Sequence, residues 1–358
     1  MKLRGRLRSG FISCLKRLAS VDDVREVVAA ELRLYNAIPP AREIAEVSRI
    51  PVPYAGLSAR PATGSLRPGT VFITGRFRSG STLLWNLFRQ VPSVTAYYEP
   101  FNERRWFDPQ TRGGRVDPTH VNVSDYWREY DGLEELSELF DENWKFRQLY
   151  MPAEAVNTDM QRYIQTLVER ARERAVIQFN EVDFRLPWLR RCFPAARIVH
   201  LYRNPREQWR STLRGTAVRM NGLTLKEFEP HDGYYLCRWA RDLRHSFPFI
   251  DVHPKTHPYK LFYQVWRLSY AFGVLYAELS VALEQILASP RETIAMIMRA
   301  CEVDDYDLNR MVGIVSPSSA EPSDANEMRQ YAQLESEVEA ELRSYSQHIE
   351  RHALRGSG

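Results

Sequence analysis

The chain has 358 residues and a formal net charge of +4, with 44% hydrophobic and 26% charged residues. These values are typical of a globular protein with a full core, and they exclude a disordered chain. The small net charge argues against a nucleic-acid partner. No run of apolar residues approaches the roughly 18 that a membrane span needs, so no membrane-spanning segment is expected.

The first 66 residues are expected to form a helical arm and a Pro-rich linker. Residues 1–20 carry basic side chains and no acidic ones. This pattern predicts either a solvated arm or an amphipathic helix in weak contact with an anionic membrane. A helix is expected over 21–35, and the segment 39–68, rich in Pro, Gly and Ser, is expected to be a surface linker.

The segment 71–90 (VFITGRFRSGSTLLWNLFRQ) is the most informative in the chain. Its composition predicts a buried strand over 70–74, and apolar residues at helical spacing predict a helix after Ser81. The loop between them contains Gly75 and Gly80. Such a corner places free backbone N–H groups at a helix N-terminus, which favours a phosphate-like ligand. The alternative is a tight turn that binds nothing.

This loop nearly fits the phosphate-binding pattern of nucleoside-triphosphate enzymes. Ser81, however, stands where that pattern has its Lys. The cations lie inside the loop instead, at Arg76 and Arg78. A guanidinium beside backbone N–H groups suits bidentate binding of an oxyanion.

Two acidic residues follow predicted strands. Glu99 comes directly after the strand expected over 94–98, and Glu181 follows the strand expected over 176–179.

The acidic and aromatic region 104–151 is expected to form helices over a substrate cleft. A further helix is expected over 159–174.

A second strand-to-helix corner lies within 197–213 (RIVHLYRNPREQWRSTL). A strand is predicted over 198–202, and Asn204, Pro205 and Glu207 have the pattern of a capped helix start. Arg203 therefore stands at the carboxyl end of a strand, where open α/β sheets bind ligands. Ser211 lies two turns into the helix, so Arg and Ser can converge on one phosphate.

Together, the two corners resemble the cofactor motifs of sulfotransferases that use 3′-phosphoadenosine 5′-phosphosulfate (PAPS). The 5′-phosphosulfate loop of that family matches Arg78-Ser79-Gly80-Ser81-Thr82, and its 3′-phosphate motif matches Arg203 and Ser211. The resemblance covers roughly 68–315. It implies an α/β fold with a P-loop-like central parallel sheet flanked by helices.

The implied organisation is a sulfotransferase domain over 67–318, after the N-terminal region 1–66 and before a helical C-terminal extension over 319–358. Tyr98-Glu99-Pro100 after the first helix resembles the branches that act on carbohydrates, lipids or protein tyrosines. The glycine-rich C-terminal cofactor loop of the cytosolic branch is not recognisable. The resemblance also implies a late strand over 281–290, followed by a helix led by Pro290.

The resemblance implies roles for individual residues. Arg78 would contact the bridging oxygen of the donor, and Glu99 would be the general base. Glu181 is the rival base, because it falls about where the cytosolic branch has a His. The predicted cofactor-binding residues are Arg76, Arg78, Ser79, Gly80, Ser81, Thr82, Arg203 and Ser211.

No metal site is predicted. His253 and His257 have a spacing that zinc sites use, but Pro254 and Pro258 argue against a helix there and no third ligand is evident.

The region 214–259 is interpreted as a lid over the acceptor. Four scattered cysteines predict free thiols in a reducing compartment, so we expect a cytoplasmic enzyme. Helices are expected over 264–278 and 327–354.

The leading hypothesis is transfer of a sulfuryl group from PAPS to a hydroxyl of a carbohydrate or another small polyhydroxy or lipid acceptor. A P-loop nucleotide kinase or related NTPase is the first alternative, although Ser81 in place of Lys argues against it. A nucleotide-binding protein without catalysis is the second.

Overall fold

A single parallel sheet organises the protein. The computed structural model describes residues 46–50, 69–214, 223–316 and 324–355. Within them, five strands pair in the order β2-β3-β1-β4-β5, and every pairing is parallel. The strands are β1 (Val71–Thr74), β2 (Val94–Tyr98), β3 (Arg174–Phe179), β4 (Arg197–Tyr202) and β5 (Leu279–Ala282). The predicted α/β fold class is therefore confirmed.

The register places the two predicted corners side by side. Thr74, the last residue of β1, lies opposite Phe179 of β3 and His200 of β4. Because the strands are parallel, their carboxyl ends open at one edge of the sheet, which is where α/β folds bind ligands.

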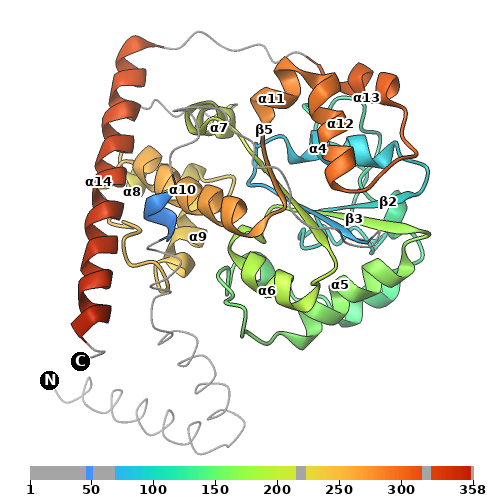
Figure 1. Ribbon diagram of the computed structural model, residues 1–358, viewed down its shortest axis with the longest axis horizontal. Helices are drawn as coiled ribbons and strands as arrows, with labels where there is room; N and C mark the ends of the chain where they lie inside the picture. Colours follow the sequence, from blue (N-terminus) through green and yellow to red (C-terminus); the bar gives the residue numbers. More distant parts are fainter. Residues whose placement is uncertain (1–45, 51–68, 215–222, 317–323, 356–358) are drawn as a thin grey trace, which may run out of the picture.

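Helices cover both faces of the sheet (Figure 1). Helix α4 (Ser81–Arg89) contacts β1, β2 and β3 on one face, and α5 (Thr158–Arg170) and α6 (Leu186–Cys192) lie on the other. This placement follows from right-handed crossovers between parallel strands. Of the apolar residues whose spacing predicts this helix, Leu84, Leu87 and Phe88 are buried and Leu83 is only partly buried. Helix α4 also buries Trp85.

The start of the helix at the second corner is capped in part as predicted. Asn204 caps α7 (Pro205–Thr212), since its side chain accepts hydrogen bonds from the N–H groups of Arg206 and Glu207. The sequence pattern also predicts a capping box, in which the Glu207 side chain accepts a hydrogen bond from the N–H of Asn204, and this prediction is wrong. The N–H of Asn204 donates to Glu284 instead, at 2.9 Å, while Glu207 pairs with Arg210 at 3.2 Å.

Short helices and one long helix follow this corner. They are α8 (Leu225–Phe228), η6 (Glu229–His231), α9 (Leu236–Leu243) and α10 (Pro258–Tyr276). Helix α10 starts earlier than predicted because Pro258 suits the first helical position and the His257 side chain accepts a hydrogen bond from the N–H of Tyr259. It contacts α6, β4 and β5.

The late strand is shorter than the resemblance implied. β5 ends at Ala282, and α11 (Leu283–Ala288) begins at once, followed by α12 (Pro290–Ala300) and α13 (Leu308–Ile314). The Gln285 side chain accepts a hydrogen bond from the N–H of Ala282 at 3.0 Å, which starts the helix there. The helix led by Pro290 is as expected.

The region 104–151 does not form the expected α-helices. It contains the 3₁₀ turns η2 (Arg128–Tyr130), η3 (Glu134–Glu138) and η4 (Glu142–Lys145). A fourth such turn, η5 (Asp183–Arg185), follows β3. Large buried side chains, including Tyr130 and Trp144, hold the region against the core.

The C-terminal helix α14 (Ala325–Arg355) confirms the helix predicted over 327–354 and runs along α10 (Figure 1). Within the predicted N-terminal linker, residues 46–49 form a helical turn, and Val47 is buried. The other expectations for residues 1–45 and 51–68 lie outside the described residues. None of the described helices combines the length and apolar character needed to cross a membrane.

Candidate functional site

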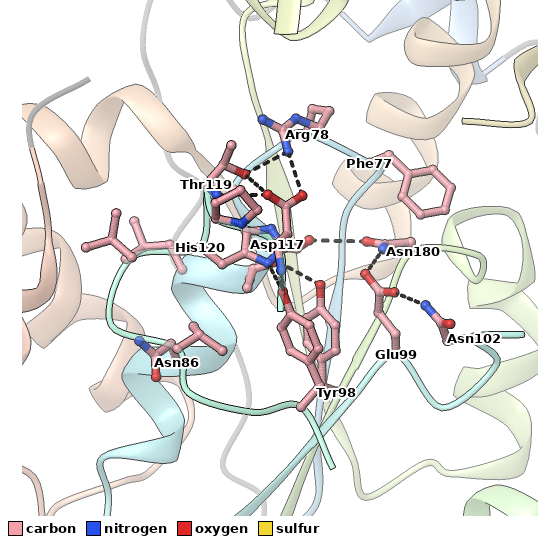
Figure 2. Close-up of a pocket in the computed structure, with 18 of the residues that line it drawn as sticks. Phe77, Arg78, Asn86, Tyr98, Glu99, Asn102, Asp117, Thr119, His120 and Asn180 are labelled. Carbon is pink, nitrogen blue, oxygen red and sulfur yellow. Dashed lines mark hydrogen bonds and ion pairs between the residues drawn. The ribbon is translucent and has the colours of Figure 1, made fainter. Parts of the chain in front are cut away.

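A cavity of about 640 Å³ opens at the carboxyl edge of the sheet. Each of the five strands leads into it: Gly80 follows β1, Glu99 follows β2, Asn180 follows β3, Arg203 follows β4 and Leu283 follows β5. The volume is within the range of small-molecule sites, roughly 300–1,000 Å³. Figure 2 shows the side chains that point into it.

Glycine is required at the start of α4. Gly80 is the N-cap residue with φ of 94°, and no side chain caps the helix. A Cβ at this position would lie 2.7 Å from Cδ1 of Leu283. The helix N-terminus therefore faces the cavity with first-turn N–H groups that a helix cannot satisfy internally, and these suit an oxyanion.

Gly80→Ala is expected to lower the free energy of unfolding by about 1 to 3 kcal/mol, because a non-glycine residue is strained at this φ and its Cβ meets Leu283. Gly113→Ala is the matched control, since Gly113 also has positive φ (61°) but a Cβ there would meet nothing within 4 Å. Urea unfolding of both variants measures the difference. An equal or larger loss in Gly113→Ala would contradict the packing argument.

Arg78 joins the two predicted corners. Its Nε donates to Oγ of Ser211 at 3.0 Å, although the two residues are 133 positions apart. Arg203 lies beside them, with Nη1 3.5 Å from the carbonyl oxygen of Arg78. All three residues line the cavity. Arg78 has φ of 66°, an uncommon backbone conformation that is found preferentially at functional sites.

A surface segment contributes a carboxylate that the sequence analysis missed. Nη1 of Arg78 lies 3.9 Å from Oδ2 of Asp117 and donates to Oγ1 of Thr119 at 3.3 Å (Figure 2). Asp117 therefore balances part of the Arg78 charge. No local pattern around Asp117 predicts this contact, because it depends on how 115–123 folds back over the loop.

Glu99 lies in the cavity and is almost fully buried. Its carboxylate accepts hydrogen bonds from Nδ2 of Asn102, at 2.7 Å, and from Nδ2 of Asn180 (Figure 2). Burial raises the pKa of Glu99, while the bond from Asn102 and the charge of Lys145 oppose that rise. Two arginines close to Glu99 in the sequence are the alternative to a catalytic role, because either could form an ion pair with it, but both have other contacts. Arg104 donates to the carbonyl of Arg115, and Arg105 pairs with Glu142.

Asn180 connects the loop to this carboxylate. Its Oδ1 accepts a hydrogen bond from Oγ of Ser81 at 3.2 Å, while its Nδ2 donates to Glu99. The sequence analysis weighed the neighbouring Glu181 and overlooked Asn180. The sequence did contain a signal for Asn180, because Asn180 and Glu181 both follow the end of a strand, where α/β folds bind ligands.

Glu181 lies apart from the cavity. It is 1% exposed and does not line the cavity; its Oε2 accepts a hydrogen bond from the N–H of Asn180 at 3.1 Å. Burial raises the pKa of Glu181, and the charge of Lys145 opposes the rise. Lys145 is itself buried and pairs with Glu103. The structure thus brings Glu99, and not Glu181, to the cavity.

Two predicted cofactor residues also lie outside the cavity lining. Arg76 is buried behind the loop, over the ring of Trp239 at 5.1 Å, and the charges of Asp183 and Asp232 act on it. Ser79 is buried, and its N–H donates to the carbonyl of Arg76 at 3.1 Å. These placements do not support the prediction that Arg76 and Ser79 contact the donor. Ser81 and Thr82 line the cavity as expected.

The histidines with zinc-like spacing act as local caps. Nδ1 of His253 accepts a hydrogen bond from the N–H of Lys255 at 3.3 Å, and Nδ1 of His257 accepts one from the N–H of Tyr259 at 3.1 Å. Among the described residues, no cluster of three or more His, Cys, Asp or Glu side chains could hold a metal ion. The three described cysteines, Cys192, Cys237 and Cys301, are free thiols.

Comparisons with known proteins point to one family. A model of the sulfotransferase family matches residues 68–265, more than half of the 358-residue chain. No curated protein matches the sequence.

A comparison with solved structures gives three sulfotransferases with low sequence identity and low TM-scores. A sulfotransferase domain from the curacin biosynthetic pathway is 16% identical, with 68% of this chain and 77% of that chain covered and a TM-score of 0.38. A sulfotransferase from Alicyclobacillus acidocaldarius is 16% identical, with coverages of 79% and 97% and a TM-score of 0.38. The sulfotransferase STF9 from Mycobacterium avium is 13% identical, with coverages of 80% and 69% and a TM-score of 0.37.

Proposed function

The chain belongs to the sulfotransferase family, and from this premise we propose that it transfers a sulfuryl group from PAPS to an acceptor hydroxyl in the cavity described above. The observation that carries the proposal is the contact between Arg78 and Ser211, with Arg203 beside them. It joins the two predicted cofactor motifs at one cavity, as a donor with phosphate groups at both ends requires.

The residues of the cavity suit the two ends of this donor. The uncapped N-terminus of α4, with the hydroxyls of Ser81 and Thr82, would hold the phosphosulfate. Arg203 and Ser211 would hold the 3′-phosphate. A guanidinium at each corner offers the bidentate geometry that suits phosphate and sulfate oxygens.

In the proposed mechanism, Glu99 accepts the proton of the acceptor hydroxyl as its oxygen forms a bond to sulfur. The bond between sulfur and the bridging oxygen of the donor breaks at the same time, and 3′-phosphoadenosine 5′-phosphate leaves with that oxygen. Arg78 stabilises the negative charge that develops there. Because Arg stays protonated, it acts by charge and hydrogen bonding and not as an acid. Asn102 and Asn180 orient Glu99 through their hydrogen bonds.

Part of the cavity lining is aromatic. Tyr98, Trp106, Tyr126 and Tyr234 line it, together with Phe77. Flat rings with polar tips can pack against sugar rings and also donate hydrogen bonds to hydroxyls. We therefore propose a carbohydrate or another small polyhydroxy or lipid acceptor.

A direct test incubates the purified protein with PAPS and a panel of glycans, polyols and hydroxylated lipids. We expect mass spectrometry to find one acceptor class that gains a single sulfo group, with equimolar 3′-phosphoadenosine 5′-phosphate. Donor binding without transfer to any acceptor would favour a binding protein. Magnesium-dependent ATP turnover without sulfation would favour the kinase alternative.

A further inference from the structure

The C-terminal helix contacts the helix that carries Ser211. Both carboxylate oxygens of Glu335, in α14, accept hydrogen bonds from Arg206, in α7: Nε to Oε1 at 2.8 Å and Nη2 to Oε2 at 2.6 Å. The hydroxyl of Tyr259, in α10, donates to the same carboxylate. Glu335 therefore links three helices at one point.

This contact is oriented and partly shielded from water. The side chains of Arg206 and Glu335 are 29% and 17% exposed. The Glu335 carboxylate raises the pKa of Arg206. A bidentate pair fixes the orientation of both groups, which a single contact between point charges does not.

Arg206 is well placed to influence the proposed 3′-phosphate corner. It lies in the first turn of α7, three residues after Arg203 and five before Ser211. A second contact at the start of α7 comes from Glu284, in α11, which accepts a hydrogen bond from the N–H of Asn204 at 2.9 Å. The start of α7 is thus held between the β5–α11 segment and α14.

The other ion pairs of α14 within the described residues do not involve α7. Glu339 pairs with Arg267 at 2.9 Å, and Glu341 pairs with Lys260 at 2.6 Å. Both partners belong to α10. These pairs attach α14 to the domain, whereas the pair made by Glu335 acts on α7.

From this arrangement we infer that Glu335 is a positioning residue for the donor site. Through Arg206 it holds the start of α7, so that Arg203 and Ser211 keep the spacing needed to bind the 3′-phosphate. The inference rests on the proposed function. It assigns part of the donor site to a helix beyond residues 68–265, the stretch that the family model matches.

The test compares Glu335→Gln with Glu341→Gln by calorimetric titration with two nucleotides, 3′-phosphoadenosine 5′-phosphate and adenosine 5′-phosphate. The second lacks the 3′-phosphate. We expect Glu335→Gln to reduce the preference for the 3′-phosphorylated nucleotide by about 2- to 30-fold, as for other residues that act on a site through neighbours. Glu341→Gln, which neutralises a more exposed carboxylate on the same helix, should change the preference by less than about 2-fold.

Arg206→Ala should lower the preference in the same direction as Glu335→Gln. The double variant should be no worse than the more affected single variant, since both changes break the same contact between Arg206 and Glu335. Thermal unfolding checks that the variants remain folded. Equal losses for both nucleotides would overturn the inference, because they indicate general weakening of the domain. So would an unchanged preference in Glu335→Gln.

The inference and the proposed function fail in different ways. If the unmodified protein shows no preference for the 3′-phosphorylated nucleotide, the proposed donor site is wrong and the inference falls with it. If the preference is present and Arg203→Ala removes it, but Glu335→Gln retains it, only the role of Glu335 is wrong.

Discussion

Glu99→Gln is expected to lower the turnover number by about 10²- to 10⁴-fold, the usual contribution of a general base. Gln has nearly the same shape, and its single amide oxygen can keep one of the hydrogen bonds from Asn102 and Asn180, but it cannot take up a proton at neutral pH. Donor affinity should therefore remain close to that of the unmodified protein. Single-turnover rates of acceptor sulfation, with nucleotide titrations beside them, measure the two effects separately.

Glu181→Gln is the control for this prediction, because Glu181 is also buried but lies outside the cavity lining. If Glu181→Gln abolishes turnover and Glu99→Gln does not, Glu99 is not the base.

The pH dependence gives a second readout of the same base. Burial raises the pKa of Glu99, and the base works only in its ionised form. Turnover should therefore rise with pH through that raised pKa and then level off. In Glu99→Gln this rise should be lost.

Arg203→Ala is expected to weaken binding of 3′-phosphoadenosine 5′-phosphate by about 2 to 5 kcal/mol, as for other truncated members of buried charge pairs. The side chain is 13% exposed and lines the cavity, so water would replace its charge poorly. Calorimetric titration measures the loss. Arg241→Ala is the control, since Arg241 pairs with Glu229 at the surface and should leave affinity unchanged. Unchanged affinity in Arg203→Ala would remove it from the site.

Much of the fold could be predicted because the strands are short, apolar and bounded by clear signals. The strands expected over 70–74, 94–98, 176–179 and 198–202 are all present, with differences of one or two residues at their ends. The strand order could not be predicted in this way. It depends on which strands pair across long stretches of sequence, for example β1 with both β3 and β4.

The region 104–151 shows why local patterns failed to predict its structure. Its composition suggested helices, but Asp108, Asp117 and Asp141 accept hydrogen bonds from the N–H groups two residues later. Such side-chain contacts form turns that compete with helix formation. The segments between these turns are held by tertiary contacts, such as the bond from the Tyr130 hydroxyl to the carbonyl of Tyr98 at 2.9 Å.

The residues of the candidate site also differ in whether local sequence patterns could predict them. Arg78, Arg203 and Ser211 could be chosen from motif spacing, and the structure brings them together. Asn180 and Asp117 could not, because their importance comes from contacts with Ser81, Glu99 and Arg78 that no local pattern encodes. Arg76 was chosen for its charge alone, and it is buried over the ring of Trp239, outside the cavity lining.

The pairing of β1 with β4 has a consequence for ligand selection. Thr74 of β1 lies opposite His200 of β4. The two strand-to-helix corners predicted from the sequence follow these two strands, one after β1 and the other after β4. The separation between the corners is thus set by main-chain hydrogen bonds between neighbouring strands, which substitutions in the cavity leave intact. Changing a side chain can alter how tightly an anion is held at either corner. We therefore expect such changes to affect the affinity for a ligand more than the length of the molecule whose two charged ends fit both corners at once.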